Sequence, residues 1–365
     1  MRRLRLAGLS LAILLLSAQV GAAQPQRSAV KKTASPIWTL AMDGSRIAYA
    51  SGGRIYVWNM ATGATSAVKG NYSNAKHSVN ATELAIAGKR IAWIKDQPAG
   101  NTEEGEKLYT ATVGGKSHEL MHAYRYGVDD STHTTGDWIE GLVGSGNSLA
   151  VSTWKSQGMT ATDQQLSLVT GSGLEALAGG TGAIVSQAVD SGHIAVLSAA
   201  PWVPSTSVSV YSTGGIPLNE FSVSDAREVA LTGDQLTVLT PSPTPTIEIY
   251  DWTTGVLKHT WPARGAATAT AGPNQVAHVE AYGGLVLYSV YSRYIGGAEK
   301  LHVLDPATGR DAVVGTVKGF GANRAWAIGS RGLVYVVNIG NYTRPSSSGK
   351  LVFVPTAKLD ALLGR

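Results

Sequence analysis

The chain has 365 residues, a formal net charge of +5 and only 15% charged residues. It contains no cysteine, which excludes disulfides, cysteine-ligated zinc and thiol catalysis. Three of its 30 basic residues, Arg2, Arg3 and Arg5, lie in an N-terminal segment that we expect to be removed, so 27 basic residues face 25 acidic ones. A mature charge near +2 gives no electrostatic reason to expect a nucleic acid or an anionic membrane as the partner.

Residues 1–23 have the pattern of a secretory signal peptide. MRRLRLAG is a basic n-region, residues 9–16 (LSLAILLL) form an apolar h-region, and small residues at 20–23 make a cleavage site. The apolar run is too short to span a bilayer, which favours a cleaved signal over an anchor. We therefore predict a signal peptide over residues 1–23 and a secreted or periplasmic protein with no transmembrane segment after cleavage.

From Ile37 to Pro355 the chain repeats one pattern seven times. Each copy has a short apolar run, a tight Gly turn, a second apolar run, a loop and a third run. The second runs, such as RIAYA from Arg46 and RIAWI from Arg90, recur at spacings of 42 to 58 residues. Repeats of this length made of strands are typical of β-propellers. We predict an all-β, seven-bladed β-propeller of four-stranded antiparallel blades over residues 37–355.

The repeats also predict the extent of each blade. The seven blades are expected at Ile37–Val68, Thr82–Leu120, Trp138–Ala178, Ala183–Phe221, Arg227–Trp261, Val276–Val314 and Arg324–Pro355. Within a blade, strands a to d run from the axis outward. Glycine is expected in the a–b and c–d turns because these hairpins need a residue at positive φ.

The last repeat has no recognisable fourth strand. After Lys350–Pro355, residues 356–365 (TAKLDALLGR) carry leucines at helical spacing and no Gly turn, so we expect a C-terminal tail with a short helix. Residues 24–36 form a polar leader ahead of the first blade. We predict that its segment Arg27–Thr33 supplies the missing outer strand, which closes the ring and removes an exposed sheet edge.

Three c–d turns carry a recognisable motif. VWNMATG (57–63), IYDWTTG (249–255) and VLDPATG (303–309) resemble the Asp-x-x-Thr-Gly turns of bacterial secreted WD-repeat-like, quinoprotein-like and surface-antigen β-propellers. The resemblance covers three blades strongly and implies the propeller fold. It assigns no function, because this fold hosts enzymes, binders and scaffolds. Quinoprotein repeats place a Trp four residues after the glycine, where this chain has His259, which argues against a bound quinone.

The two faces of the predicted propeller differ. Because strands alternate in direction, the a–b and c–d turns share one face, and the b–c and d–a loops share the other. The turns are short and uniform, whereas the predicted b–c and d–a loops are long and rich in aromatic and charged residues. Binding groups concentrate in loops carried by a rigid scaffold. We therefore expect the face with the b–c and d–a loops, called the looped face below, to bind a partner.

The richest predicted loop is Met121–Asp137, between blades two and three. Tyr, Trp and Arg are typical of recognition surfaces, where they combine apolar area with polar tips, and the same aromatics stack on sugar rings. The candidate binding residues on the looped face are Tyr72, His77, His122, Tyr124, Arg125, Tyr126, Asp129, Asp130, His133, Trp154, Trp202, Arg293, Tyr294, Tyr342 and Arg344.

The segment His118–His122 (HELMH) matches the H-E-x-x-H pattern of zinc proteases. That chemistry needs both imidazoles on one turn of a helix, but this segment falls where strand d of blade two is expected. On a strand, His118 and His122 share a face about 13 Å apart, too far for one ion. The weak metal candidates are His118, His122 and His133, and the acidic groups 103–106 and 129–137 lack the ligand order of an EF-hand.

The sequence thus predicts an exported, monomeric propeller that binds a protein or a glycan through its looped face without catalysis. One alternative is a metal-assisted hydrolase or lyase that uses the segment 121–137. Another is a scaffold for assembly of the cell envelope. No cofactor is expected, with calcium or another divalent metal as the alternative.

Overall fold

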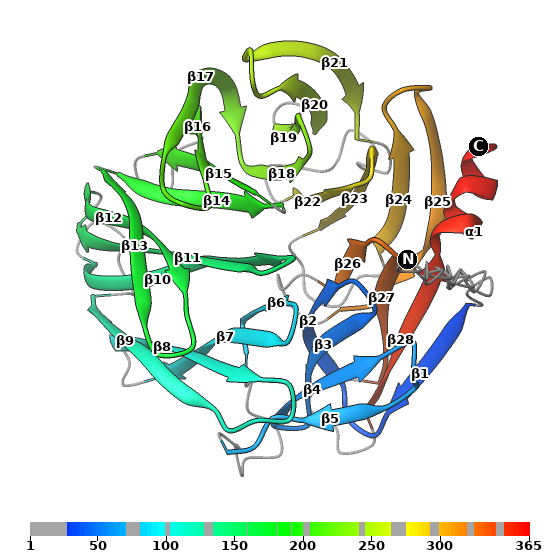
Figure 1. Ribbon diagram of the computed structural model, residues 1–365, viewed down its shortest axis with the longest axis horizontal. Helices are drawn as coiled ribbons and strands as arrows, with labels where there is room; N and C mark the ends of the chain where they lie inside the picture. Colours follow the sequence, from blue (N-terminus) through cyan, green and yellow to red (C-terminus); the bar gives the residue numbers. More distant parts are fainter. Residues whose placement is uncertain are drawn as a thin grey trace, which may run out of the picture.

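Seven units of four antiparallel strands surround a central axis in the part of the chain that the structure describes (Figure 1). The structure is a computed structural model. It describes residues 28–70, 81–98, 103–127, 134–158, 160–180, 182–190, 192–199, 205–240, 245–263, 275–292, 299–319, 325–340 and 347–365. The predicted all-β, seven-bladed β-propeller is confirmed.

The first three blades follow the first three repeats. Blade one contains β2 (Ile37–Asp43), β3 (Arg46–Ser51), β4 (Arg54–Asn59) and β5 (Thr65–Ala67). Blade two contains β6 (Glu83–Ala87), β7 (Arg90–Pro98), β8 (Glu103–Thr112) and β9 (His118–Tyr126). Blade three contains β10 (Thr135–Ser145), β11 (Ser148–Gln157), β12 (Thr160–Val169) and β13 (Leu174–Gly180).

The remaining blades continue the same order around the axis. Blade four contains β14 (Ala183–Val189), β15 (His193–Ala199), β16 (Ser205–Ser212) and β17 (Pro217–Ala226). Blade five contains β18 (Glu228–Thr232), β19 (Gln235–Thr240), β20 (Thr246–Asp251) and β21 (Val256–Pro262). Blade six contains β22 (Gln275–Tyr282), β23 (Leu285–Ser292), β24 (Glu299–Asp305) and β25 (Arg310–Val317). Blade seven contains β26 (Trp326–Gly329), β27 (Gly332–Ile339), β28 (Ser348–Pro355) and β1 (Ala29–Thr33).

The N-terminal strand closes the ring, as predicted. β1 pairs antiparallel with β28, so that Ala29 lies opposite Phe353 and Thr33 lies opposite Gly349 (Figure 1). The helix α1 (Thr356–Leu363) follows β28 directly and lies beside β25 of blade six. Its Leu359 side chain is buried in the hydrophobic core. The last blade therefore takes its outer strand from the N-terminal end of the described chain and its other three strands from the C-terminal end, and the helix stands where the other blades have a c–d turn.

The three motif turns share one local structure. The side-chain oxygens of Asn59, Asp251 and Asp305 each accept a hydrogen bond from the backbone N–H two residues later, at 3.0 Å in all three turns. Each turn ends in a glycine at positive φ, between 69° and 73°. An Asn or Asp followed by such a glycine is the chemistry that a tight hairpin requires.

Some glycines of the c–d turns also let neighbouring blades approach closely. A Cβ atom on Gly255, in the c–d turn of blade five, would lie 3.0 Å from the Cβ atom of Phe221 on the outer strand of blade four. A Cβ atom on Gly215 would lie 2.9 Å from the carbonyl oxygen of Leu177 on the outer strand of blade three. The Gly turn therefore serves both hairpin geometry and contact between blades.

Polar side chains link the blades near the axis. In several blades, a side chain of an inner or second strand accepts a hydrogen bond from a backbone N–H of the next blade's innermost strand. These bonds run from Leu142 to Glu83 (2.6 Å), Val229 to Ser186 (3.1 Å), Val279 to Glu228 (2.9 Å), Ile328 to Glu280 (3.1 Å) and Ile37 to Asn338 (2.9 Å). The bonds to Glu83, Glu228 and Glu280 are charge-assisted and therefore stronger than the neutral ones, so these acidic residues help to hold the ring together.

The hydrophobic core lies between the blades. Separate buried clusters occupy the junctions between successive sheets, and the largest joins blades six, seven and one with the leucines of α1. Among the described residues, no helix is long and apolar enough to cross a membrane.

Candidate functional site

The segment 121–137 is not one long loop, and that part of the prediction was wrong. β9 extends to Tyr126 and β10 begins at Thr135, and these two residues pair with each other. Arg125 pairs with Gly136 in the same way, so blades two and three merge into one eight-stranded sheet. A Cβ atom on Gly136 would lie 2.2 Å from the carbonyl oxygen of Tyr124. Glycine therefore permits the close approach that turns the expected loop into paired strands.

The predicted b–c loops of blades two and three are also mostly strand. Gln97 pairs with Gly105 across the β7–β8 hairpin, and Gln157 pairs with Thr160 across β11–β12. The strands β7 to β12 have 9 to 11 residues each, whereas those of blade five have 5 to 7. The extra length lies at the looped face. We call this raised sheet the wall; it comprises residues 95–98, 103–107, 122–126, 135–140, 154–157 and 160–164.

One surface of the wall carries a row of aromatic rings. His122, Tyr124 and Tyr126 alternate along β9 and so share a face. The ring centroids are 6.0 Å apart for His122 and Tyr124 and 5.1 Å apart for Tyr124 and Tyr126, both edge-to-face. Gly105 of β8 lies opposite Tyr124, and a Cβ atom there would lie 3.3 Å from His122 Nε2. The missing side chain leaves room for the rings, and Tyr126 remains 54% exposed.

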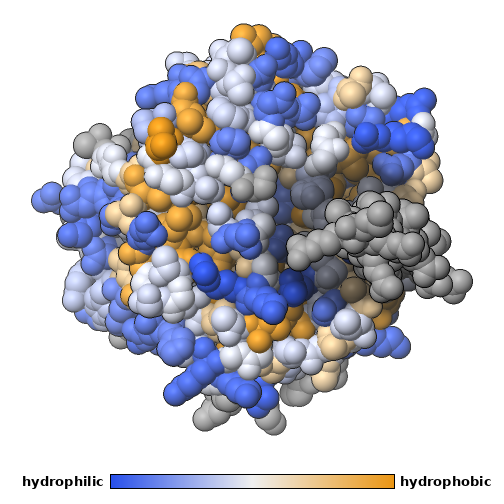
Figure 2. Space-filling model, in the orientation of Figure 1, coloured by the Kyte–Doolittle hydropathy of each residue, from blue (hydrophilic) through white to orange (hydrophobic). Residues whose placement is uncertain are grey.

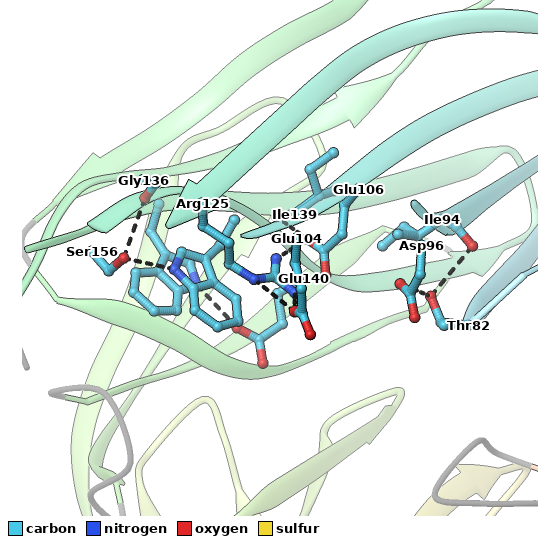
Figure 3. A network of polar contacts seen from close by, with 12 residues as sticks. Thr82, Ile94, Asp96, Glu104, Glu106, Arg125, Gly136, Ile139, Glu140 and Ser156 are labelled. Atoms are coloured by element: carbon cyan, nitrogen blue, oxygen red, sulfur yellow. Dashed lines mark hydrogen bonds and ion pairs between the residues drawn. The ribbon is translucent and has the colours of Figure 1, made fainter. Parts of the chain in front are cut away.

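Arg125 lies on the opposite face of β9 and is buried. Its guanidinium forms ion pairs with Glu104 at 2.7 Å and with Glu106 at 2.9 Å (Figure 3). Its Cζ atom also lies 3.8 Å from the ring centroid of Trp138, which is a cation–π contact. Sequence reasoning placed Arg125 on the binding surface, but strand alternation turns it towards blade three.

Two tryptophans extend this interior stack. Trp138 on β10 lies opposite Trp154 on β11, and their rings are parallel with centroids 4.9 Å apart. The Trp138 Nε1–H donates to Ser156 Oγ at 2.9 Å, and the Trp154 Nε1–H donates to a carboxylate oxygen of Glu140 at 3.0 Å. Trp154, a predicted binding residue, is only 4% exposed, so it supports the wall from inside.

Carboxylates outnumber cations at the base of the wall (Figure 3). Glu106 accepts a hydrogen bond from the backbone N–H of Ile139 at 3.1 Å, which ties blade two to blade three. Burial raises the pKa of Glu140 to about 7, and the nearby carboxylates of Glu83 and Glu106 act in the same direction. Burial also raises the pKa of Asp96 from its ordinary value. Sequence reasoning missed Trp138 and Glu140 as parts of this site.

The HELMH segment forms a strand, but the two histidines do not share a face. A β-bulge at Leu120 puts His118 opposite Thr110 and His122 opposite Lys107. Because Thr110 and Lys107 are three residues apart on β8, the two imidazoles point to opposite sides of the sheet. They therefore do not face one metal ion, and the expected shared face was wrong.

Glu119 of the same segment is already engaged. Its carboxylate accepts hydrogen bonds from Lys107 Nζ at 2.9 Å and from the Tyr109 hydroxyl at 3.2 Å. The bond from Lys107 lowers the pKa of Glu119 below its ordinary value. Within the described ranges, no group of three or more His, Cys, Asp or Glu side chains has the arrangement to hold a metal ion.

The remaining predicted binding residues lie outside the described residues. They are Tyr72, His77, Asp129, Asp130, His133, Trp202, Arg293, Tyr294, Tyr342 and Arg344. Figure 2 shows that, on the face in view, hydrophilic residues divide the apolar surface into separate patches. Large exposed apolar side chains on outer strands include Leu218, Val256, Leu257 and Val313, and Ile216 lies directly before β17. The wall is thus the part of the looped face where described aromatic and charged side chains are brought together.

The chain is similar to several solved structures, and this likeness assigns it no function. No protein-family model and no curated protein sequence matches the chain. Solved structures that are similar include the β-propeller domain of the Trilobed protease from Pyrococcus furiosus, with 12% identity and a TM-score of 0.48, covering 83% of this chain and 91% of that one. TolB from Acinetobacter baumannii has 13% identity and a TM-score of 0.42, covering 90% of this chain and 79% of that one. The tricorn protease has 13% identity and a TM-score of 0.45, covering 83% of this chain, which spans 29% of the protease.

Proposed function

We propose that this protein is an exported, non-catalytic propeller that binds a protein or a glycan through its looped face, with the wall as the main contact surface. The observation that carries the proposal is the row of His122, Tyr124 and Tyr126 on one face of β9. Exposed aromatic rings with polar tips supply contact area at low cost in side-chain entropy.

The interior of the wall supports this proposal because it makes the surface rigid. The Arg125 guanidinium and the stacked pair Trp138 and Trp154 fix β9 and β10 from behind. A binding surface held in one conformation loses less entropy when the partner docks. A rigid row of rings is therefore suited to recognition of an extended partner, whether a polypeptide or a polysaccharide chain.

Binding is tested with a tyrosine pair on opposite faces of the propeller. The purified mature protein is screened against a glycan array and against envelope proteins, together with Tyr126→Ala and Tyr282→Ala. Tyr282 is the matched control because it is 41% exposed and ends β22 at the a–b turn, on the other face. We expect Tyr126→Ala to weaken binding about tenfold, which corresponds to about 1.4 kcal/mol, and Tyr282→Ala to bind as the wild type.

The class of ligand follows from which screen responds. Binding to glycans alone identifies a lectin-like protein, and binding to a protein alone identifies an assembly or adaptor role. Equal binding by the wild type and Tyr126→Ala contradicts the assignment to the wall. A metal-dependent hydrolytic activity of the purified wild type contradicts the non-catalytic proposal.

Export is tested separately. A signal peptide over residues 1–23 predicts that the mature protein begins near Gln24. Fractionation of the producing cells, followed by N-terminal sequencing, measures both the compartment and the first residue. An uncleaved protein that stays in the cytoplasm contradicts this part of the proposal.

A further inference from the structure

Glu140 occupies an unusual position at the base of the wall. It lies on β10, next to Ile139, whose backbone N–H donates a hydrogen bond to Glu106 of blade two, and its own carboxylate accepts a hydrogen bond from Trp154 Nε1 at 3.0 Å. The cation that acts on this group is Arg125, whose guanidinium already forms ion pairs with Glu104 and Glu106. A charged Glu140 is therefore an additional carboxylate around one cation.

The groups that act on Glu140 come from the elements packed around it. β6 contributes Glu83, which accepts a hydrogen bond from the backbone of Leu142 at 2.6 Å, and β8 contributes Glu106. The cation is Arg125 on β9, and the hydrogen-bond donor is Trp154 on β11. Two carboxylates thus oppose a negative charge on Glu140, while one guanidinium and one indole N–H favour it.

We propose that Glu140 acts as a proton-operated joint between blades two and three: its protonated form holds the end of β9 against β10, and loss of the proton loosens this end of the wall. Protonation removes the repulsion between Glu140 and the carboxylates of Glu83 and Glu106. It also leaves Arg125 free to remain between Glu104 and Glu106.

The backbone pairing of β9 with β10 transmits the effect of Glu140 to the aromatic row on the outer surface of the wall. Arg125 pairs with Gly136, and Tyr126 pairs with Thr135, at the only step where β9 and β10 are paired in the described part of the chain. When Glu140 is charged, it competes with Glu104 and Glu106 for Arg125. Because Arg125 lies between Tyr124 and Tyr126 on β9, its displacement also disturbs the two tyrosines. Burial raises the pKa of Glu140 to about 7, so this change falls near neutral pH.

The first test follows the proton at Trp154. Protein labelled with ¹⁵N in its nine tryptophans gives indole N–H signals, and the signal of Trp154 is assigned by its loss in Trp154→Phe. We expect this signal to shift with a midpoint near pH 7 and to lose that inflection in Glu140→Gln. A signal without an inflection between about pH 5.5 and 8.5, or an inflection that survives in Glu140→Gln, overturns the proposal.

The second test does not depend on assigning an indole signal, and it distinguishes the proposed role of Glu140 from a general effect of pH on the protein. Hydrogen exchange of residues 122–126 and 135–140, corrected for the intrinsic pH dependence, is compared at pH 6 and pH 8. We expect about tenfold faster exchange at pH 8 in the wild type and no such change in Glu140→Gln. The control is Glu175→Gln on β13, an exposed carboxylate in the same sheet, which keeps the wild-type behaviour. Equal protection from hydrogen exchange at both pH values in the wild type contradicts the proposed role of Glu140.

Discussion

Blade five and the wall of blades two and three are built from the same repeat, yet they end differently at the looped face. Blade five has strands of 5 to 7 residues and tight turns, and its outer strand β21 is almost entirely exposed. The wall has strands of 9 to 11 residues, and buried charges and stacked indoles lie at its base. On the other face the two regions are alike, because the a–b turns of blades two, three and five each contain a glycine at positive φ: Gly88, Gly146 and Gly233.

This difference separates the part of the repeat that makes the fold from the part that varies. Glycine turns and Asx contacts recur on the turn face because tight hairpins require a residue at positive φ and a side chain that bonds the turn amides. Strand length at the looped face is free of that requirement. We expect buried ion pairs such as that of Arg125 with Glu106 to help give the longer sheet one defined conformation.

The largest expected effect comes from breaking the buried ion pairs of the wall. Arg125→Leu leaves Glu106, which is 9% exposed, without its cation, so we expect a loss of about 3–5 kcal/mol in the free energy of unfolding. Urea denaturation measures the change. The control is Lys155→Ala, which removes an ion pair with Asp163 between side chains that are 57% and 66% exposed, and it should cost about 0–1 kcal/mol. Equal losses in the two variants contradict the proposed role of the buried network.

A second substitution breaks the junction of blades two and three through the backbone. Gly136 has φ of 138°, and a Cβ atom would lie 2.2 Å from the carbonyl oxygen of Tyr124. We expect Gly136→Ala to cost about 2–4 kcal/mol, because β10 must move away from β9. Gly171→Ala, in a turn with nothing within 4 Å of the added Cβ atom, is the control and should unfold as the wild type.

Ring closure gives a third prediction, in a region far from the wall. Deletion of residues 24–33 removes β1 and leaves β28 with an unpaired edge. We expect a loss of about 2–3 kcal/mol from ladder hydrogen bonds, and association of the protein through the open edge. Denaturation and analytical ultracentrifugation measure both effects. Deletion of residues 24–27 alone, which precede β1, should leave both unchanged.

A fourth expected effect on stability depends on pH. The pKa of Glu140 is raised from 4.5 to about 7 in the folded protein, so between these values the folded state binds more protons than the unfolded state. This carboxyl therefore contributes stability below about pH 4.5, and its contribution falls as the pH rises towards 7. Glu140→Gln should remove this dependence and should be more stable than the wild type at pH 8. A wild type that gains stability relative to Glu140→Gln as the pH rises contradicts the assignment.

The sequence was sufficient to predict the fold, and particular residues explain why. Apolar runs such as RIAYA and RIAWI alternate with Gly turns at a regular period, and each run became a second strand, β3 and β7. The absence of a Gly turn after Pro355 predicted the closing strand, which is β1. These features depend on local turn chemistry and on strand alternation, both of which can be read along the chain.

The site was predicted only in part. His122, Tyr124 and Tyr126 were found by their residue types and do lie together, but Arg125 was assigned to the wrong face. Reading 121–137 as a loop hid the alternation that places Arg125 inside. The bulge at Leu120 and the merging of two sheets at Gly136 depend on contacts between distant segments, which spacing alone does not show. Extending the strand alternation of β7 and β8 through residues 95–106 would have revealed the wall.

The most direct test of the central claim is to capture the partner at the wall in the producing cells. A photo-crosslinking phenylalanine analogue is placed at position 126 on β9 or, as a matched control, at position 282 on the opposite face; both positions carry exposed tyrosines. We predict a defined adduct from position 126 and none from position 282. An adduct from position 282 with none from position 126 would contradict the claim that the looped face binds the partner.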